Sequence, residues 1–123
     1  RVRKLDLATG IITTVAGGGT RTPDNVPANQ AQFSRTDGLA LDPAGNLYIA
    51  TSGNGLIVQI SAATGVAKII AGASGTAGLG GDGGPAKNAK LNVPSRIWID
   101  AAGNLYFSDR GNNRIRAIRG PLP

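Results

Sequence analysis

The sequence predicts an all-β protein made of repeated four-stranded antiparallel sheets. Three observations support this fold class: the composition, an internal repeat, and the turn residues inside that repeat. Among 123 residues there are 19 Gly and 7 Pro, which favour frequent turns and few helices. Hydrophobic residues make up 41% of the chain, which is enough for a packed core. Short strands joined by turns are therefore expected throughout.

The internal repeat is visible when the sequence is compared with itself. Residues 33–60 align with residues 91–118 without a gap, at a spacing of 58 residues. The agreement is strongest where LDPAGNLYI at residues 41–49 falls on IDAAGNLYF at residues 99–107. A period of about 50 residues is typical of propellers and solenoids, in which each repeat is one supersecondary unit.

Four short apolar or alternating runs lie within one repeat, and turn residues separate them. In the complete copy these runs cover residues 39–42, 47–51, 56–61 and 66–71. The turn between the first two runs offers an Asp side chain as a hydrogen-bond acceptor and a Gly for positive φ, which are hairpin features. The four runs are predicted to form one antiparallel sheet. The turn residues of the two copies are Asp42, Gly45, Asn46, Asp100, Gly103 and Asn104.

A long loop is predicted between the last run of one repeat and the first run of the next, over residues 72–95. Pro85 is placed to begin a one-turn helix over residues 86–91, because proline fits the first position of a helix. Asp24 and Asp82 occur at the same place in the two copies, before the proline of this short helix. They are predicted to cap the helix or to accept a turn hydrogen bond.

The motifs of this repeat resemble those of NHL-repeat β-propellers, of the type abundant in bacterial extracytoplasmic proteins. They are IITTVAG at residues 11–17, GDGGPA at 81–86, DAAGNLY at 100–106 and SDRGNNRIR at 108–116. The resemblance implies propeller blades of four antiparallel strands and an extracellular or periplasmic location. The sequence itself shows neither a secretory signal nor a stretch long and apolar enough for a membrane span.

Three parts of one propeller domain are expected. Residues 1–17 supply the last strands of one blade, residues 18–72 a complete blade with its leading loop, and residues 73–123 a second blade that lacks its last strand. About two and a quarter blades cannot close a ring, since propellers typically have at least four. The sequence is therefore predicted to be a segment of a longer chain that is insoluble, unfolded or multimeric when isolated.

Asp109 and Arg114 bracket the predicted hairpin between the second and third runs of the second repeat, with Asn112 between them. A structural ion pair between the two charged side chains, or a clamp on the backbone, is predicted because the strand ends meet there. Thr51 and Leu56 occupy the corresponding positions of the first repeat, so no such pair is expected there.

The composition removes several chemistries from this chain. It has no Cys, His, Met or Glu, which excludes zinc ligation by thiolate or imidazole and nucleophilic catalysis assisted by His. No catalytic residue, cofactor or metal site is predicted. Four of the five aromatic side chains lie in predicted strands and are expected to pack in the core, namely Tyr48, Trp98, Tyr106 and Phe107.

The net charge is +6, and the excess of basic residues is concentrated at one end of the predicted sheets. The hairpins between the second and third strands share this end with the long loops, and together they hold eight basic and four acidic residues. A solvated surface without a ligand is an equally good interpretation, because Lys and Arg are ordinary surface residues. The candidate binding face consists of Arg21, Arg35, Lys87, Lys90, Arg96 and Arg110.

The leading functional hypothesis is a non-enzymatic binding or structural scaffold. Its partner would be a protein, the remaining blades of the same chain, or an anionic polymer. One alternative is a segment of a metal-dependent lyase or hydrolase whose active-site residues lie in other blades. Another is a component of an extracellular filament or surface assembly formed by copies of the chain. Nucleic acid is disfavoured as a partner, because no loop aromatic is present to stack on bases.

Overall fold

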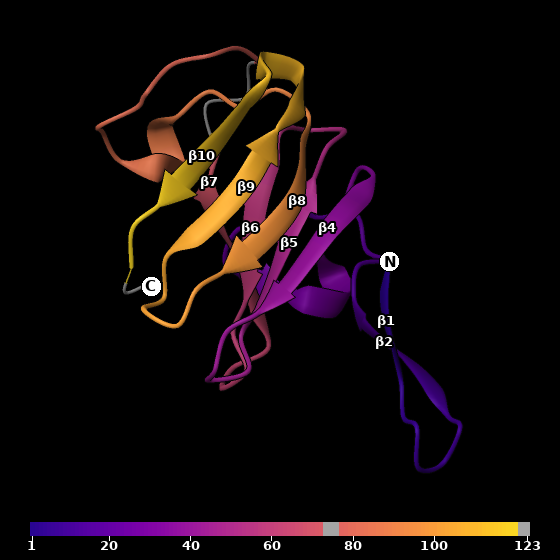
Figure 1. Ribbon diagram of the computed structural model, residues 1–123. Coiled ribbons are helices and arrows are strands. Elements are labelled where there is room, and N and C mark those ends of the chain that lie inside the picture. Colours follow the sequence, from indigo (N-terminus) through magenta and orange to yellow (C-terminus); the bar gives the residue numbers. More distant parts are fainter. Residues whose placement is uncertain (73–76, 121–123) are drawn as a thin grey trace.

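The computed structural model describes residues 1–72 and 77–120 and shows an all-β fold, which confirms the predicted fold class (Figure 1). The described residues form three antiparallel sheets and no α-helix. The N-terminal hairpin consists of β1 (Val2–Leu5) and β2 (Ile12–Ala16). The C-terminal sheet, in the order β10-β9-β8, contains β8 (Pro94–Ile99), β9 (Leu105–Asp109) and β10 (Arg114–Ile118).

The central sheet has the strand order β3-β7-β6-β5-β4 and contains the predicted four-stranded meander. One strand of it was not predicted: β3 pairs with the outer edge of β7, where Val26 lies opposite Ala67. Two residues are too few to show the alternating pattern by which strands are recognised in a sequence. The strands are β3 (Val26–Pro27), β4 (Thr36–Leu41), β5 (Leu47–Thr51), β6 (Leu56–Ile60) and β7 (Val66–Ala71).

The helix predicted over residues 86–91 is shorter in the structure. Pro85 precedes a single 3₁₀ turn, η2 (Ala86–Asn88), and Ala89 is already extended. The turn stops there because Ala89 and Leu91 enter the core between the central and C-terminal sheets. The first repeat has the same turn, η1 (Ala28–Gln30), and a third 3₁₀ turn, η3 (Arg110–Asn112), links β9 to β10. Residues 73–76 of the predicted second long loop lie outside the described residues.

The two faces of the central sheet carry two separate cores, because neighbouring side chains of a strand point to opposite faces. One face packs against the N-terminal hairpin and η1, and it includes Ile49, Val58 and Ile60. The other face packs against the C-terminal sheet, and it includes Tyr48, Ala50 and Ile57 with Leu105 and Phe107 from β9.

Gly38 allows β4 to approach β8 closely at the junction of the two larger sheets. A Cβ atom at this position would overlap the main-chain carbonyl of Ser95. Any larger residue would therefore separate the first strands of the two repeats, so glycine is needed here for close packing rather than for a turn.

The sequence predicted that the aromatic side chains of the strands pack in the core, but the structure shows that not all of them do. Tyr48 and Phe107 are buried, but Trp98 is 63% exposed and stacks against Tyr106 with ring centroids 5.5 Å apart. Trp98 lies on the face of the C-terminal sheet that points away from the central sheet, where Ile115 is 71% exposed. In contrast, Val2 of the N-terminal hairpin is buried against the central sheet.

Candidate binding face

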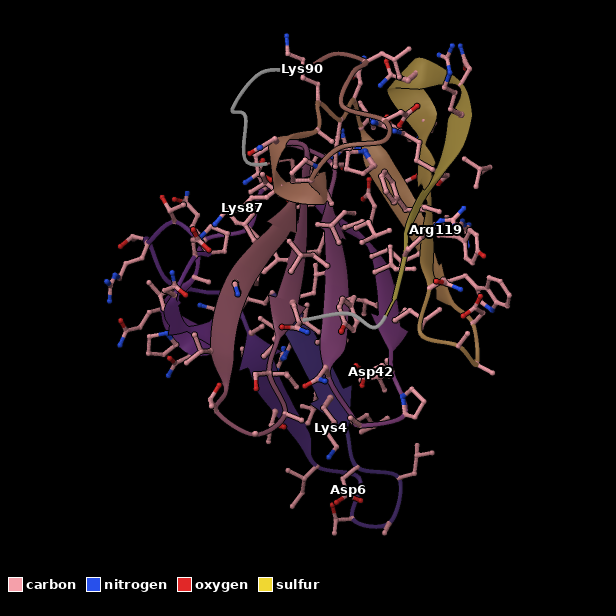
Figure 2. The ribbon with its side chains drawn as sticks, turned by 90° about the vertical axis from the view of Figure 1, so that its left-hand side faces the viewer. Lys4, Asp6, Asp42, Lys87, Lys90 and Arg119 are labelled. Atoms are coloured by element: carbon pink, nitrogen blue, oxygen red, sulfur yellow. The ribbon has the colours of Figure 1, made fainter. Side chains whose placement is uncertain are left out.

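The links between the second and third strands of both repeats and the long loops gather at one end of the strands, as an antiparallel meander requires. We call this the long-loop end. Figure 2 shows Lys90 at this end, and it shows Asp6 and Asp42 toward the opposite end. Lys4 also lies toward the opposite end, so that end is less acidic than a count of its loop residues alone indicates.

All six residues of the predicted binding face are exposed in the structure. They come from different elements: three from the long loops, one from the residue before β4, one from β8 and one from η3. Two of them have described side-chain partners. Arg21 Nη1 donates to Gln30 Oε1 at 2.9 Å, and Lys87 Nζ lies 3.1 Å from Asp24 Oδ2. Arg35, Lys90, Arg96 and Arg110 take part in none of the ion pairs among the described residues.

The ion pair of Lys87 with Asp24 joins the two long loops, 63 residues apart in the sequence. Its two side chains are partly exposed, so the pair contributes at most about 1 kcal/mol. The second oxygen of Asp24 accepts the backbone N–H of Ile69 in β7 at 3.1 Å. The pair therefore fixes the position of one basic side chain without stabilising the fold strongly.

The predicted capping role of Asp24 and Asp82 is wrong. Neither short 3₁₀ turn has a side-chain cap; Pro27 and Pro85 occupy the capping positions. Both carboxylates are used instead to fasten a long loop to a strand, Asp24 through Ile69 and Asp82 through Arg116. The sequence could not show these contacts, because the partners lie 34 to 45 residues away along the chain.

Asp109 is fully buried at the end of β9 and has three described hydrogen-bond donors. Its Oδ1 accepts the backbone N–H of Asn92 at 2.7 Å. Its Oδ2 accepts Asn112 Nδ2 at 2.7 Å and Arg116 Nη1 at 3.2 Å. A buried carboxylate needs this kind of compensation, because an unpaired charge in the interior is very costly.

The ion pair predicted between Asp109 and Arg114 is wrong, because Asp109 pairs with Arg116 instead. The alternative prediction of a backbone clamp is confirmed, since Asp109 accepts the backbone N–H of Asn92. Arg114 lies opposite Asp109 in the strand register, but its side chain is exposed and donates to the carbonyl of Asn112 at 3.2 Å. Arg116 is two residues further along the same face, where the strand is covered by the long loop. A basic residue at an inward-facing position of an alternating strand was the signal that identifies it.

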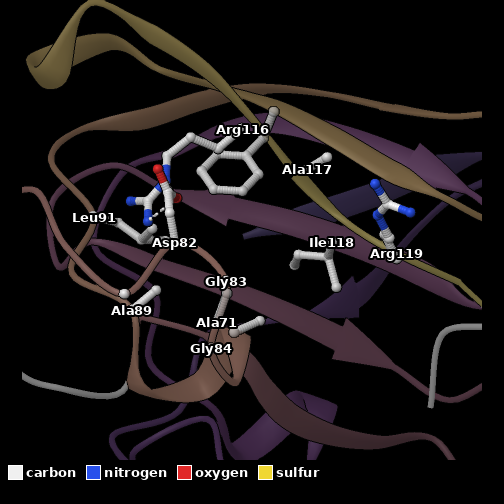
Figure 3. A pocket seen from close by; sticks show the side chains of 13 residues that line it. Ala71, Asp82, Gly83, Gly84, Ala89, Leu91, Arg116, Ala117, Ile118 and Arg119 are labelled. Atoms are coloured by element: carbon white, nitrogen blue, oxygen red, sulfur yellow. Dashed lines mark hydrogen bonds and ion pairs between the residues drawn. The ribbon is translucent and has the colours of Figure 1, made fainter.

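Arg116 also holds the second long loop against β10, as Figure 3 shows for Asp82. Its side chain is only 6% exposed. The guanidinium lies 2.8 Å from Asp82 Oδ1 and donates to the carbonyl oxygens of Lys90 at 2.6 Å and Gly80 at 2.8 Å. This Arg116 centre is a structural clamp that orders the loop carrying Lys87 and Lys90.

The predicted turn residues form the same network in both repeats, at the end opposite the long loops. Asp42 accepts the backbone N–H and the side-chain amide of Asn46, and it accepts the Tyr48 hydroxyl at 3.1 Å. Asp100 makes the equivalent contacts with Asn104 and Tyr106. Each turn also contains a glycine with positive φ, +87° at Gly45 and +84° at Gly103.

These hydrogen bonds affect the protonation of the turn carboxyls. Burial raises the pKa of Asp42, but donation from Asn46 and Tyr48 outweighs it and brings the pKa below the ordinary value of 3.8. Donation from the Asn104 side chain and N–H likewise lowers the pKa of Asp100. Burial raises the pKa of the Tyr48 hydroxyl, which therefore stays protonated at neutral pH.

Residues 1–72 and 77–120 contain no group of three or more acidic, Cys or His side chains that could bind a metal ion. No helix described in these ranges is long and apolar enough to cross a membrane. The long-loop end, with its exposed basic side chains, is therefore the candidate site.

The consecutive antiparallel sheets, their turn networks and their long loops define a repeat domain of the NHL class. Residues 27–119 match the family model described as the teneurin NHL domain. The chain belongs to this family. The predicted NHL repeat is thus confirmed, and the family model that matches is the teneurin one, while the bacterial extracytoplasmic type stays a prediction.

Two curated relatives illustrate the similarity. Teneurin-4 of Homo sapiens is 37% identical over 107 residues, which cover 78% of this chain and 4% of that protein. NHL repeat-containing protein 3 of Mus musculus is 31% identical over 103 residues, which cover 81% of this chain and 26% of that protein. The chain thus spans only a small part of the relatives that it matches.

Two solved structures from Bacteroides thetaiotaomicron show the same fold. One, a protein of unknown function, has a TM-score of 0.77 and 24% identity, covering 88% of this chain and 27% of that one. The other is described as an auxiliary nutrient binding protein, with a TM-score of 0.68 and 23% identity, covering 94% of this chain and 31% of that one. None of the four proteins has an enzyme's name.

Proposed function

We propose that this NHL segment is a non-enzymatic binding scaffold that contacts an acidic protein or another anionic polymer through its long-loop end. The observation that carries the proposal is that all six basic side chains of the predicted face are exposed. Five of them, all but Lys87, take part in none of the ion pairs of the described residues, so their charges are free to meet an anion. The Arg116 centre keeps the supporting loop in place, which reduces the entropy lost on binding.

The binding role is placed outside the cytoplasm because the motifs of the repeat resemble those of bacterial extracytoplasmic NHL proteins. One similar structure is described as a nutrient binding protein, which is consistent with a fold that presents loops to a ligand. Repeat domains of this kind place variable loops on a rigid set of strands. The non-enzymatic assignment rests on the same relatives and on the absence of His, Cys and Glu from the sequence.

The test uses labelled poly-L-glutamate as an anionic probe and measures binding by fluorescence anisotropy at two salt concentrations. Reversing four charges, Arg21→Glu, Arg35→Glu, Arg96→Glu and Arg110→Glu, is expected to weaken binding by about tenfold or more. Arg3→Glu with Lys4→Glu is the control, because these residues belong to β1 and not to the long-loop end. Binding that is unchanged by the four reversals would remove this face from the proposal.

The exposed apolar residues favour a second role for the two outer faces, contact with further blades or further copies. Trp98 and Ile115 are exposed on one face, and Leu39 and Leu41 are exposed on β4 of the central sheet. In the C-terminal sheet the residues equivalent to Leu39 and Leu41, Ile97 and Ile99, are partly buried against the central sheet. The mass of the native particle tests the contact between copies. A particle that has the mass of a monomer, and keeps this mass when Trp98→Lys is introduced, would exclude that contact.

A further inference from the structure

A small polar pocket of about 250 Å³ lies between the two repeats at the long-loop end. One wall is the turn between β5 and β6, which contains Ser52 and Asn54. The other wall is the segment that leads into β8, which contains Asn92 and Val93. Both walls come from the middle of the sequence and belong to consecutive repeats of the same chain. The pocket is smaller than those that enclose drug-sized ligands, so it suits a single side chain of a larger partner.

The pocket contains hydrogen-bond donors that the described residues leave unused. Asn54 Oδ1 accepts the hydroxyl of Thr51, while its Nδ2 donates to none of the described residues. The half-buried Asn92 has a paired main chain, but its side-chain amide bonds to no residue of the described ranges. In the second repeat, the aligned Asn112 donates twice from its Nδ2, to a carboxylate and to a carbonyl oxygen. Two amide groups of the pocket therefore remain available to a ligand that accepts hydrogen bonds.

Two exposed arginines flank the pocket, one beside each wall. The carbonyl oxygen of Arg35 accepts the N–H of Ser52 at 2.9 Å, and the N–H of Arg110 donates to the carbonyl oxygen of Val93 at 3.2 Å. Each arginine is thus joined through its main chain to a residue that lines the pocket. Neither guanidinium has a partner in the part of the chain that the structure describes. Guanidinium groups recognise carboxylates through two parallel hydrogen bonds.

The main chain beside the pocket has an unusual conformation. Val93 has φ +56° and the aligned Arg35 has φ +54°, in the left-handed region that is uncommon for non-glycine residues and rarest for β-branched ones. Such a conformation persists only where the surroundings hold it, and it is frequent at binding sites. At both positions the carbonyl oxygen accepts a backbone N–H from the facing turn. The walls of the pocket are therefore fixed before a ligand binds, which reduces the cost of binding.

We propose that this pocket receives one carboxylate side chain of an acidic polypeptide, while Arg35 and Arg110 bind the carboxylates on either side of it. Hydrogen bonds from amide and guanidinium groups to carboxylates are about twice as strong as those between neutral groups. None of the described residues that line the pocket is aromatic, which disfavours partners that bind by stacking their rings. The proposal rests on the function proposed above and narrows its partner to a polypeptide.

The test measures the binding of fluorescein-labelled hexaglutamate to the full 123-residue chain by fluorescence anisotropy. Saturable binding is expected, and hexaglutamine should bind at least about tenfold more weakly because it has no carboxylates. Asn54→Asp is expected to weaken the binding of hexaglutamate about tenfold or more, since it places a like charge in the pocket. This substitution keeps the oxygen that accepts the Thr51 hydroxyl, so the turn retains its hydrogen bond.

Asn113→Asp is the matched control for the added charge. Asn113 is exposed in the corresponding turn of the second repeat, at the same end of the strands, and it does not line the pocket. Its replacement is expected to weaken binding about twofold at most, because salt screens an exposed charge outside the pocket. Circular dichroism checks that each variant is folded. Asn54→Ala, which removes the amide without adding a charge, should weaken binding about fivefold and replaces Asn54→Asp if that variant does not fold.

The outcomes distinguish the pocket from the basic face as a whole. If the four charge reversals weaken the binding of poly-L-glutamate but Asn54→Asp acts no more strongly than Asn113→Asp, the basic face stands and the pocket proposal is overturned. If neither hexaglutamate nor poly-L-glutamate binds, both proposals fail. If dextran sulfate binds more tightly than poly-L-glutamate of equal charge, and Asn54→Asp weakens it as much, the pocket takes a sulfated polymer and the polypeptide is excluded.

Discussion

The central and C-terminal sheets differ most at two aligned positions, 51 and 58 in one and 109 and 116 in the other. The central sheet has Thr51 and Val58, and the latter is fully buried among aliphatic side chains. The C-terminal sheet has Asp109 and Arg116, an ion pair that is also buried. The same two positions of one fold are thus filled either by apolar packing or by compensated charges.

The loop aspartates of the two repeats have different described partners. In the central sheet β7 pairs with β6, and Asp24 fastens the long loop to a backbone N–H of β7. In the C-terminal sheet the aligned Asp82 fastens its loop to Arg116 of β10. The comparison teaches that the loop aspartate is a common anchor, whose partner is a main-chain group in one repeat and a guanidinium in the other.

The largest effect is expected when an arginine, as found in the C-terminal sheet, is placed at the aligned apolar position of the central sheet. Val58→Arg should lower the free energy of unfolding by about 4 kcal/mol or more, because a buried guanidinium would meet Thr51 instead of a carboxylate. Urea denaturation followed by circular dichroism measures this. A well-folded Val58→Arg protein would show that the two sites are interchangeable.

The converse change removes the charge from the C-terminal sheet. Arg116→Val should cost about 3 kcal/mol, because Asp109 is left buried with only its two uncharged donors. The double substitution Asp109→Thr with Arg116→Val reproduces the composition of the central sheet and should recover most of this loss. Equal destabilisation by the single and double variants, in the same urea assay, would contradict the interpretation of the pair.

A smaller effect is expected at the turns, where the two sheets are alike. Asn46 accepts the N–H of Ala62 and Asn104 accepts the N–H of Gly120, so each ties its turn to a neighbouring segment. Asn46→Ala and Asn104→Ala should each cost about 1 kcal/mol in urea denaturation. Different costs would indicate that the surroundings of the turns differ more than their hydrogen bonds do.

The smallest effect concerns pH. The folded state lowers the pKa of Asp42, so the stability that its carboxylate contributes is complete above the ordinary value of 3.8 and is lost as the pH falls through the lower, folded value. The unfolding temperature should therefore fall below pH 4 with a steeper slope in the natural sequence than in Asp42→Asn. Parallel slopes would assign the acid sensitivity to other groups.

The sequence predicted the strands and tight turns well because their signals are local. The alternation in residues 47–51 and the turn residues Asp42 and Gly45 lie within a few positions of one another, and the structure has a strand and a turn there. The two-residue strand β3 and the early end of the 3₁₀ turn after Asn88 were missed, since a partner strand and a core determine them.

The sequence by itself determined the all-β class, the repeat, the positions of the basic side chains along the chain and the lack of His, Cys and Glu. Only the tertiary structure decided that Arg116 and not Arg114 pairs with Asp109, that Trp98 is exposed, and that a polar pocket lies between the two repeats. The physical reason is that burial and pairing depend on which face of a sheet is covered. That coverage comes from segments such as the loop of Gly80 and Asp82, 34 to 36 residues away from Arg116.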